Sequence, residues 1–362
     1  MKERGARRLH GLDLARALAF AGMVLVNFKV SMGASADPDA PLVLTRLCSL
    51  LDGRAAATFV VLAGAGASLG SRRARLSEDA AQHRAARRTL LRRGAVLMGM
   101  GLLLLPVWPA DILHFYGVYL ALGSLLLFAP LWLLGITGSI AVLVSFGFIL
   151  SGRFFEHWDM ATLGYRGLAT PGGFLRNTFL DGFHPVLPWI AFYLLGMALG
   201  RMNLASRSLQ MMLVLGALPL TAIADWASWQ LLGPRGSDLS RIPESSWRWL
   251  FYVDPVPPLP LFVISAGATA CALIGLCLWI TPSEPGRAWR PWLAMGRLAL
   301  SLYVAHVLVG LGFLEAIGRL QGQSLVFATT SGLAFVGLSL LASWVHDRLW
   351  SRGPLERILR SV

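Results

Sequence analysis

The chain has 362 residues, of which 56% are hydrophobic and only 14% are charged, and its mean hydropathy is +0.61. A soluble protein of this length cannot bury so much apolar surface, so the composition excludes a soluble globular protein and predicts a polytopic membrane protein. The net charge of +13 would also suit a nucleic-acid-binding protein. The basic residues lie between apolar runs, however, and this placement argues against that class.

Apolar runs long enough to span a bilayer recur along the whole chain. They predict an all-α membrane helix bundle of about ten transmembrane helices, in a single domain that covers residues 1–362. Counts of nine or eleven fit the same pattern. The ten runs lie at 12–32, 50–70, 92–109, 111–130, 132–151, 184–202, 208–231, 256–281, 293–316 and 323–345.

If each apolar run crosses the membrane, the segments between the runs lie alternately on its two sides. Most basic residues then fall in the segments on one side. The most basic of these is the loop 71–93, and the two chain ends add to the same side. By the positive-inside rule this side is cytoplasmic, which predicts an N-in, C-in topology. The loop 71–93 would then face anionic lipid. Two long outer loops, 152–183 and 232–255, are of a size that often shapes a binding site, although plain connectors are as common.

The first apolar run carries three polar residues on one stripe. At about 100° per residue, Asp13, Arg16 and Asn27 fall within roughly 60° of one another, and the stripe is roughly 20 Å long. Ionisable groups in a membrane helix are costly and normally face a bundle interior, a partner or a wet cavity. The stripe is therefore either a structural Asp–Arg pair at the helix entrance or part of a functional path, and the sequence leaves both open.

Three of the seven histidines map to the outer half of the predicted bundle: His114, His184 and His306. His114 follows Asp111 by three residues, which predicts a carboxylate on the same helical face that orients the imidazole as a general base. His306 shares a face with Tyr303 and is the alternative base. A single bundle histidine is usually structural, but three at one level indicate a site. The same level holds four further polar residues, Lys29, Asp52, Arg54 and Asp225.

A second polar layer is predicted at the cytoplasmic ends of the helices. Its members are one carboxylate and four guanidiniums, Asp13, Arg16, Arg92, Arg93 and Arg297. Guanidiniums grip phosphate bidentately, so this layer is suited to an anionic donor such as coenzyme A. Snorkelling anchors at the membrane surface explain the same residues equally well. The chain has no Walker motif, Rossmann fingerprint, HExxH sequence or paired cysteines, so no metal site is predicted.

Five stretches resemble the bacterial YeiB-like membrane proteins and the related heparan-alpha-glucosaminide N-acetyltransferase family. They are RLHGLDLARALAFAGMVLVN, LLDGRAAATFVVLAGAGASL, RRTLLRRGAVLMGMGLLLL with DILHFYGVYLALG, HPVLPWIAFYLLGMALGR, and AMGRLALSLYVAHVLVG. The first, fourth and fifth are the more specific, and their order and spacing cover most of the chain. The residues that match the family pattern are Asp13, Arg16, Asn27, His114, Pro188, Trp189, Gly296, Arg297 and Tyr303.

The resemblance implies a multi-pass protein of a bacterial inner membrane and acyl transfer across that membrane. The expected donor is cytoplasmic acyl-CoA, with acetyl-CoA favoured, and the expected acceptor is a hydroxyl or amine on the far side, such as that of a glycan. The candidate catalytic residues are then His114, Asp111 and His306. The candidate donor- and substrate-binding residues are Asp13, Arg16, Asn27, Arg92, Arg93, His184, Trp189, Arg297 and Tyr303. The sequence departs from the family at one point. The eukaryotic acetyltransferases carry their proposed catalytic histidine after the first helix, and residues 28–47 here contain no histidine.

Two other classes remain open at this stage. A transporter or flippase for a small anionic or lipid-linked substrate would use the same polar path without covalent chemistry, and such proteins often show inverted repeats or paired broken helices. A sensor or scaffold protein would use the histidines structurally. Membrane lipids and a small-molecule or glycan acceptor are the expected partners, nucleic acid is not, and a homodimer is an open alternative.

Overall fold

The computed structural model describes residues 8–159, 163–233, 246–350 and 352–362. These residues are almost entirely helical, which confirms the all-α prediction. Their only strands form a two-residue antiparallel pair, β1 (Trp158–Asp159) and β2 (Gly164–Tyr165). The helices are α1 His10–Ser31, α2 Leu42–Ser49, α3 Arg54–Gly70, α4 Arg72–Arg75, α5 Ala80–Leu104, α6 Leu113–Leu125, α7 Leu131–Leu150, α8 Pro171–Arg176, α9 Val186–Leu199, α10 Arg207–Leu232, α11 Pro260–Ile280, α12 Arg290–Arg297, α13 Ala299–Ala305, α14 Gly312–Ala316, α15 Leu325–Leu349 and α16 Pro354–Ser361.

Seven helical segments in the described part of the chain are long and apolar enough to cross a membrane. An eighth span is added if Pro171–Asp181 and Val186–Leu199, which are bent by 53° at their junction, cross as one. The chain is therefore a multi-pass membrane protein, and the expected ten spans are an approximate count. The two runs that fall short are α5, whose first half is basic, and α6, which has only 13 residues. The N-in, C-in orientation stays a prediction.

The predicted cytoplasmic loop 71–93 is mostly helical, which corrects the sequence interpretation. Its second half belongs to α5, which begins at Ala80 because the Asp79 side chain accepts a hydrogen bond from the Ala81 backbone N–H at 2.7 Å. Such N-caps satisfy the amide groups at a helix start, and the many alanines and arginines that follow are strong helix formers. The basic segment is thus an extension of a helix and not an irregular connection.

The chain divides into two compact units that alternate along the sequence. Unit 1 contains Met1–Leu51, Asn203–Pro219 and Thr269–Ile358, and unit 2 contains Asp52–Met202, Leu220–Ala268 and Leu359–Val362. That residues 1–362 act as a single domain stays a prediction.

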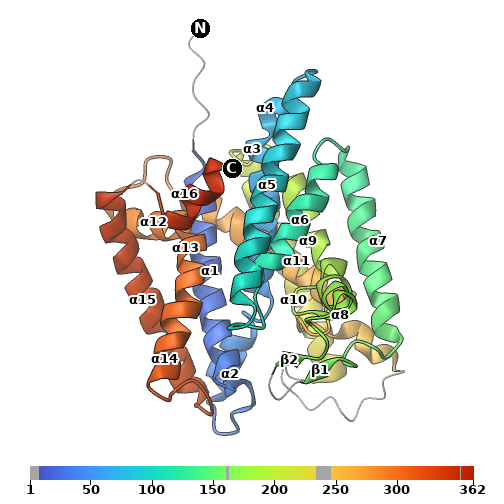
Figure 1. The fold of residues 1–362 in the computed structure, drawn as a ribbon, viewed down its shortest axis with the longest axis vertical. Helices are drawn as coiled ribbons and strands as arrows, with labels where there is room; N and C mark the ends of the chain where they lie inside the picture. Colours follow the sequence, from blue (N-terminus) through green and yellow to red (C-terminus); the bar gives the residue numbers. More distant parts are fainter. Residues whose placement is uncertain (1–7, 160–162, 234–245, 351) are drawn as a thin grey trace. The chain divides into compact units, whose positions relative to one another are not determined.

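In unit 1, α1 packs against α12 and α15, and α12 also packs against α15 (Figure 1). The contact between α1 and α12 is backbone to backbone, since a Cβ atom added to Gly296 would lie only 1.8 Å from the carbonyl oxygen of Asp13. Only glycine fits such an approach. The close packing buries Asp13 together with many apolar side chains of α1, whereas Arg16 and Asn27 of the polar stripe are only partly buried.

In unit 2, α5 packs along α6, and α9 packs against both α3 and α7. The Ser68 hydroxyl of α3 donates to the carbonyl oxygen of Met197 in α9 at 2.7 Å. Large aromatic side chains that are fully buried fill the interior around α6 and α9: Phe115, Tyr119, Trp189, Phe192 and Tyr193. Unit 2 therefore has an aromatic core.

The predicted outer loop 152–183 is folded in its described part. The buried carboxylate of Asp181 accepts hydrogen bonds from the Tyr165 hydroxyl at 2.6 Å and from Arg176 Nε at 2.7 Å. The backbone carbonyl of the same residue accepts from Trp158 Nε1 at 2.6 Å. Burial and the Asp181 carboxylate raise the pKa of Tyr165, so its hydroxyl stays a donor. In the other outer loop, 232–255, residues 234–245 lie outside the described residues.

Candidate active site

The buried pair Asp111 and His114 stands at the beginning of α6. This helix begins at Leu113, so Asp111 precedes it and does not lie on its face as the sequence suggested. Asp111 Oδ2 accepts from the backbone N–H of His114 at 3.1 Å and lies 3.0 Å from His114 Nδ1. The carboxylate reaches the imidazole because it also caps the helix start, where backbone N–H groups lack intrahelical partners.

This geometry selects one tautomer of the neutral His114 ring. A carboxylate only accepts hydrogen bonds, so Nδ1 carries the proton and Nε2 carries the lone pair. The side chains of His114 and Asp111 are 1% and 0% exposed. Nε2 has no hydrogen-bond partner among the described residues. An imidazole oriented in this way, with its second nitrogen available, meets the requirements of a general base.

The helix α5 supports this pair through Gly101. A Cβ atom at this position would lie 2.2 Å from the His114 backbone nitrogen and 2.6 Å from Asp111 Oδ2. No side chain fits there without displacing the pair. Gly101 therefore fixes how closely α5 approaches the start of α6, although no sequence signal distinguishes it from the other glycines of α5.

A chain of tilted and edge-to-face ring contacts leads from His114 into the interior of unit 2. The ring centroids are 3.9 Å apart for His114 and Phe115, 5.9 Å for Phe115 and His184, and 4.6 Å for His184 and Trp189. The structure thus gathers His114, His184 and Trp189, three of the predicted site residues, in one place. The predicted outer residues Arg54 and Asp225 form an ion pair of 2.6 Å in the same unit.

Several polar atoms around these rings are buried without a hydrogen-bond partner in the described residues. Besides His114 Nε2 they are Tyr116 Oη, His184 Nδ1, Trp189 Nε1 and Tyr193 Oη. Buried polar groups are normally paired with protein or ordered water, so this group of atoms is a candidate place for water or for the polar atoms of a ligand. Sequence reasoning missed Tyr116 and Tyr193. Their phenol groups inside apolar helical runs were the available signal.

The second candidate base, His306, belongs to unit 1 and is held differently. Its Nδ1 contacts the carbonyl oxygen of Tyr303, and its Nε2 lies 2.8 Å from Asn27 Nδ2. A carbonyl only accepts, so Nδ1 donates and Nε2 accepts from the Asn27 amide. Asn27, the last residue of the polar stripe of α1, therefore contacts His306. In this arrangement the lone pair needed for base catalysis is already engaged.

The predicted inner layer is only partly brought together. Asp13 accepts from Arg8 Nε and from Arg16 Nη1, both at 2.9 Å, and Arg297 forms an ion pair with Asp347. Arg8 and Asp347 were not among the predicted residues. The remaining two members, Arg92 and Arg93, lie on α5 in unit 2.

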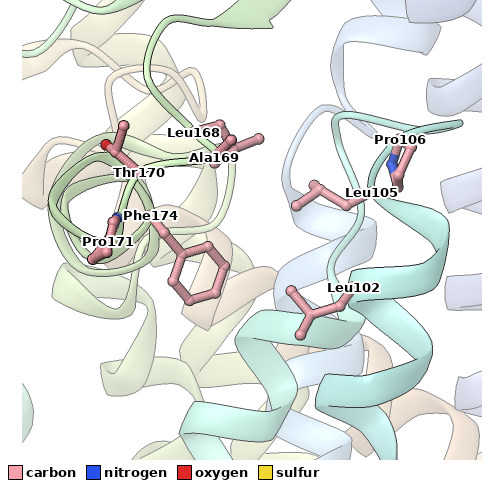
Figure 2. A pocket seen from close by; sticks show the side chains of 8 residues that line it. All are labelled: Leu102, Leu105, Pro106, Leu168, Ala169, Thr170, Pro171 and Phe174. Carbon is pink, nitrogen blue, oxygen red and sulfur yellow. The ribbon is translucent and has the colours of Figure 1, made fainter.

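An open cavity of 530 Å³ lies in unit 2 between the end of α5 and the segment that enters α8 (Figure 2). Its lining residues are Leu102, Leu105, Pro106, Leu168, Ala169, Thr170, Pro171 and Phe174. The ring of Phe174 is 6.3 Å from that of His114.

Within the described ranges, no three His, Cys, Asp or Glu side chains gather as a metal site.

Comparison with known protein families gives two matches. A family model described as Heparan-alpha-glucosaminide N-acetyltransferase, catalytic, matches residues 8–232, which is more than half of the chain. The chain belongs to this family. The match includes Asn27, Asp111 and His114. A second model, described as Protein of unknown function (DUF418), matches residues 259–362, which hold Arg297 and His306. Both matches confirm the resemblance to the YeiB-like relatives of the acetyltransferases. None of the curated proteins matches the chain.

Proposed function

We propose that this membrane protein is an acyltransferase that moves an acyl group from cytoplasmic acyl-CoA to a hydroxyl or amine acceptor on the outer side of a bacterial inner membrane. The observation that carries the proposal is the buried Asp111–His114 pair, whose Nε2 atom has no partner among the described residues. This pair lies in the region matched by the catalytic family model. The name of that family supports an acetyl group, and so acetyl-CoA as the donor substrate, and a glycan as the acceptor.

The reaction requires one base near the acceptor. His114 Nε2 takes the proton from the acceptor O–H or N–H while that oxygen or nitrogen attacks the carbonyl carbon of the thioester. The carbon–sulfur bond then breaks, coenzyme A leaves as a thiolate, and this thiolate takes up a proton to become the free thiol. Asp111 stabilises the imidazolium that forms and holds the ring in the orientation that points Nε2 at the acceptor.

We assign the anionic part of the donor to Arg16 and Arg297. Their side chains are 31% and 24% exposed, and each already pairs with a carboxylate. Partly exposed ion pairs are weak, so the phosphates of coenzyme A can compete for these guanidiniums. Arg297→Ala should weaken acetyl-CoA binding while the melting temperature of the unliganded protein stays close to that of the wild type.

A transporter is the competing function, and one observation argues against it. Transporters of the inverted-repeat type place broken helices at corresponding positions of their two halves. Among the described residues only one bent pair is found, Pro171–Asp181 with Val186–Leu199. Membrane lipids remain a predicted partner, and a homodimer remains an open alternative.

The test uses the purified protein in lipid nanodiscs. Acetyl-CoA should raise the melting temperature more than ATP does, and addition of an acceptor should release the free thiol of coenzyme A together with an acetylated product. A transporter would move its substrate and leave the thioester intact. Absence of thiol release with every hydroxyl and amine acceptor tried, in protein that binds acetyl-CoA, would therefore overturn acyl transfer.

A further inference from the structure

The cavity in unit 2 has two walls (Figure 2). One is the end of α5 with Leu102 and Leu105, followed by Pro106, and the other is the segment 168–174. Figure 2 shows the ring of Phe174 projecting from the second wall toward Leu102. The volume of 530 Å³ lies within the range of about 300–1,000 Å³ that is typical of small-molecule sites. The cavity is therefore large enough to hold part of a ligand.

The lining offers almost nothing to a polar ligand. It contains no charged side chain, and its one hydroxyl belongs to Thr170. That hydroxyl donates to the Gly167 carbonyl at 2.7 Å and accepts from the Gly173 N–H at 3.1 Å. A sugar ring or a phosphate would lose its hydration here without gaining hydrogen bonds, which is costly. The walls instead suit a hydrocarbon chain.

The surface around the cavity is also apolar. Leu102 is 44% exposed, Leu103 81%, Val107 62% and Leu175 55%. Exposed apolar side chains of this kind on a multi-pass membrane protein are suited to contact with lipid chains. A hydrocarbon chain could therefore reach the cavity along these side chains.

On the inner side of the cavity, the side chain of Phe174 lies between the cavity and the candidate base. Phe174 lines the cavity, and its ring lies 6.3 Å from the imidazole of His114. On the other wall, Leu102 follows Gly101, whose Cα packs directly against the Asp111–His114 pair. The buried Nε2 atom of His114 has no partner among the described residues, so it is a group that could receive a proton from a polar head.

We propose that this cavity binds the hydrocarbon chain of a lipid-linked acceptor and so delivers the acceptor hydroxyl or amine to His114. The inference rests on the proposed acyl transfer, and it adds the chemical class of the acceptor. The transferred proton and acyl group follow the steps given above, with the lipid head as the nucleophile. Phe174 acts as a positioning residue between the chain and the base.

A photoreactive long-chain alcohol that carries a diazirine in its chain tests the binding step. With the protein in nanodiscs, cross-linked residues should concentrate in 102–106 and 168–174. The labelling should saturate and should be competed by unlabelled long-chain alcohol but not by glucosamine. Labelling spread evenly over the lipid-facing surface would mean ordinary bilayer contact and would overturn the proposal.

Two matched tryptophan variants sharpen this experiment. Ala169→Trp fills the cavity and should reduce saturable labelling by about tenfold, because the indole takes the volume of the chain. Leu103→Trp adds the same group on the exposed face next to the cavity and should leave the labelling unchanged. Equal labelling of wild type and Ala169→Trp, with both proteins folded by thermal melting, would contradict the assignment.

Transfer assays separate failure of this inference from failure of the proposed function. If acetyl transfer to soluble glucosamine is efficient and unaffected by Ala169→Trp, the function stands and the lipid-linked acceptor is overturned. If the alcohol labels the cavity but no acceptor of either kind is acetylated, the function is overturned and the acceptor role with it. The proposal is supported if the protein acetylates a lipid-linked amine or alcohol and if Ala169→Trp slows this transfer more than Leu103→Trp does.

Discussion

The two buried histidines His114 and His306 show how differently the two units hold the same side chain. In unit 2, His114 is oriented by Asp111 on one nitrogen and has no described partner on the other. In unit 1, both nitrogens of His306 contact neighbours, Tyr303 and Asn27. A polar partner alone therefore does not make a histidine a base. What distinguishes the candidate base is an oriented ring whose lone pair is not already used.

The difference also has an energetic side. A buried polar atom without a partner costs about 1–3 kcal/mol relative to a paired one. Unit 1 avoids that cost at His306, while unit 2 carries it at His114 and at the neighbouring phenol and indole groups. Such groups are retained where binding of a ligand satisfies them. The comparison therefore makes His114 the better candidate for a reactive role and His306 the better candidate for a structural one.

The largest effect is expected for His114→Ala. Loss of a general base slows transfer by about 10²–10⁴-fold, whereas acetyl-CoA binding, measured by thermal shift, should persist. His306→Ala is the matched control, because it removes a buried imidazole of the same size. Acetylated product from labelled acetyl-CoA is the readout. The assignment of the base to His114 would be wrong if His306→Ala abolished transfer and His114→Ala did not.

Gly101→Ala should disturb the same pair without altering either of its side chains. The added methyl group would lie 2.2 Å from the His114 nitrogen and 2.6 Å from Asp111 Oδ2, so the start of α6 must shift. We expect transfer to be strongly reduced and the melting temperature to fall. Gly99→Ala is the control on the same helix, since nothing lies within 4 Å of its added Cβ atom. Equal behaviour of the two variants would show that the close approach does not matter.

Asp111→Asn should have a smaller effect than His114→Ala. The amide oxygen of asparagine can still cap the start of α6, so the fold should be kept. The amide can also donate to Nδ1, which would favour the tautomer with its proton on Nε2 and remove the lone pair from the acceptor. We expect transfer to slow by at least about tenfold, with donor binding intact. Wild-type rates in steady-state assays would mean that the carboxylate only caps the helix.

The smallest effect on chemistry is expected for Asn27→Leu. It leaves His306 Nε2 buried without its described partner, which should cost about 1–3 kcal/mol of stability. The double variant Asn27→Leu with His306→Leu replaces both polar groups and should recover part of that loss. Thermal unfolding measures stability, and the product assay measures transfer. A strong loss of transfer in well-folded Asn27→Leu would move this pair from a structural to a catalytic role.

The sequence predicted features that depend on local spacing. The apolar runs located the helices, and the three-residue separation of Asp111 and His114 indicated their pairing, although α6 begins only at Leu113. Contacts between distant parts of the chain left no such trace. Asn27 and His306 are 279 residues apart, and Arg297 meets Asp347 through helix packing. The fixed structure of the outer segment around Asp181 and the cavity beside Phe174 arise only when the helices assemble.

In the proposed reaction, burial of His114 would also protect the donor from hydrolysis. A thioester is open to attack by water as well as by an acceptor, and water is always the more abundant nucleophile. A base on the protein surface would activate both. The His114 side chain is only 1% exposed, so a proton reaches its ring from a molecule bound in the interior of unit 2 and not from bulk solvent. In the proposed reaction, we therefore expect acetyl-CoA to be cleaved only when an acceptor is in place.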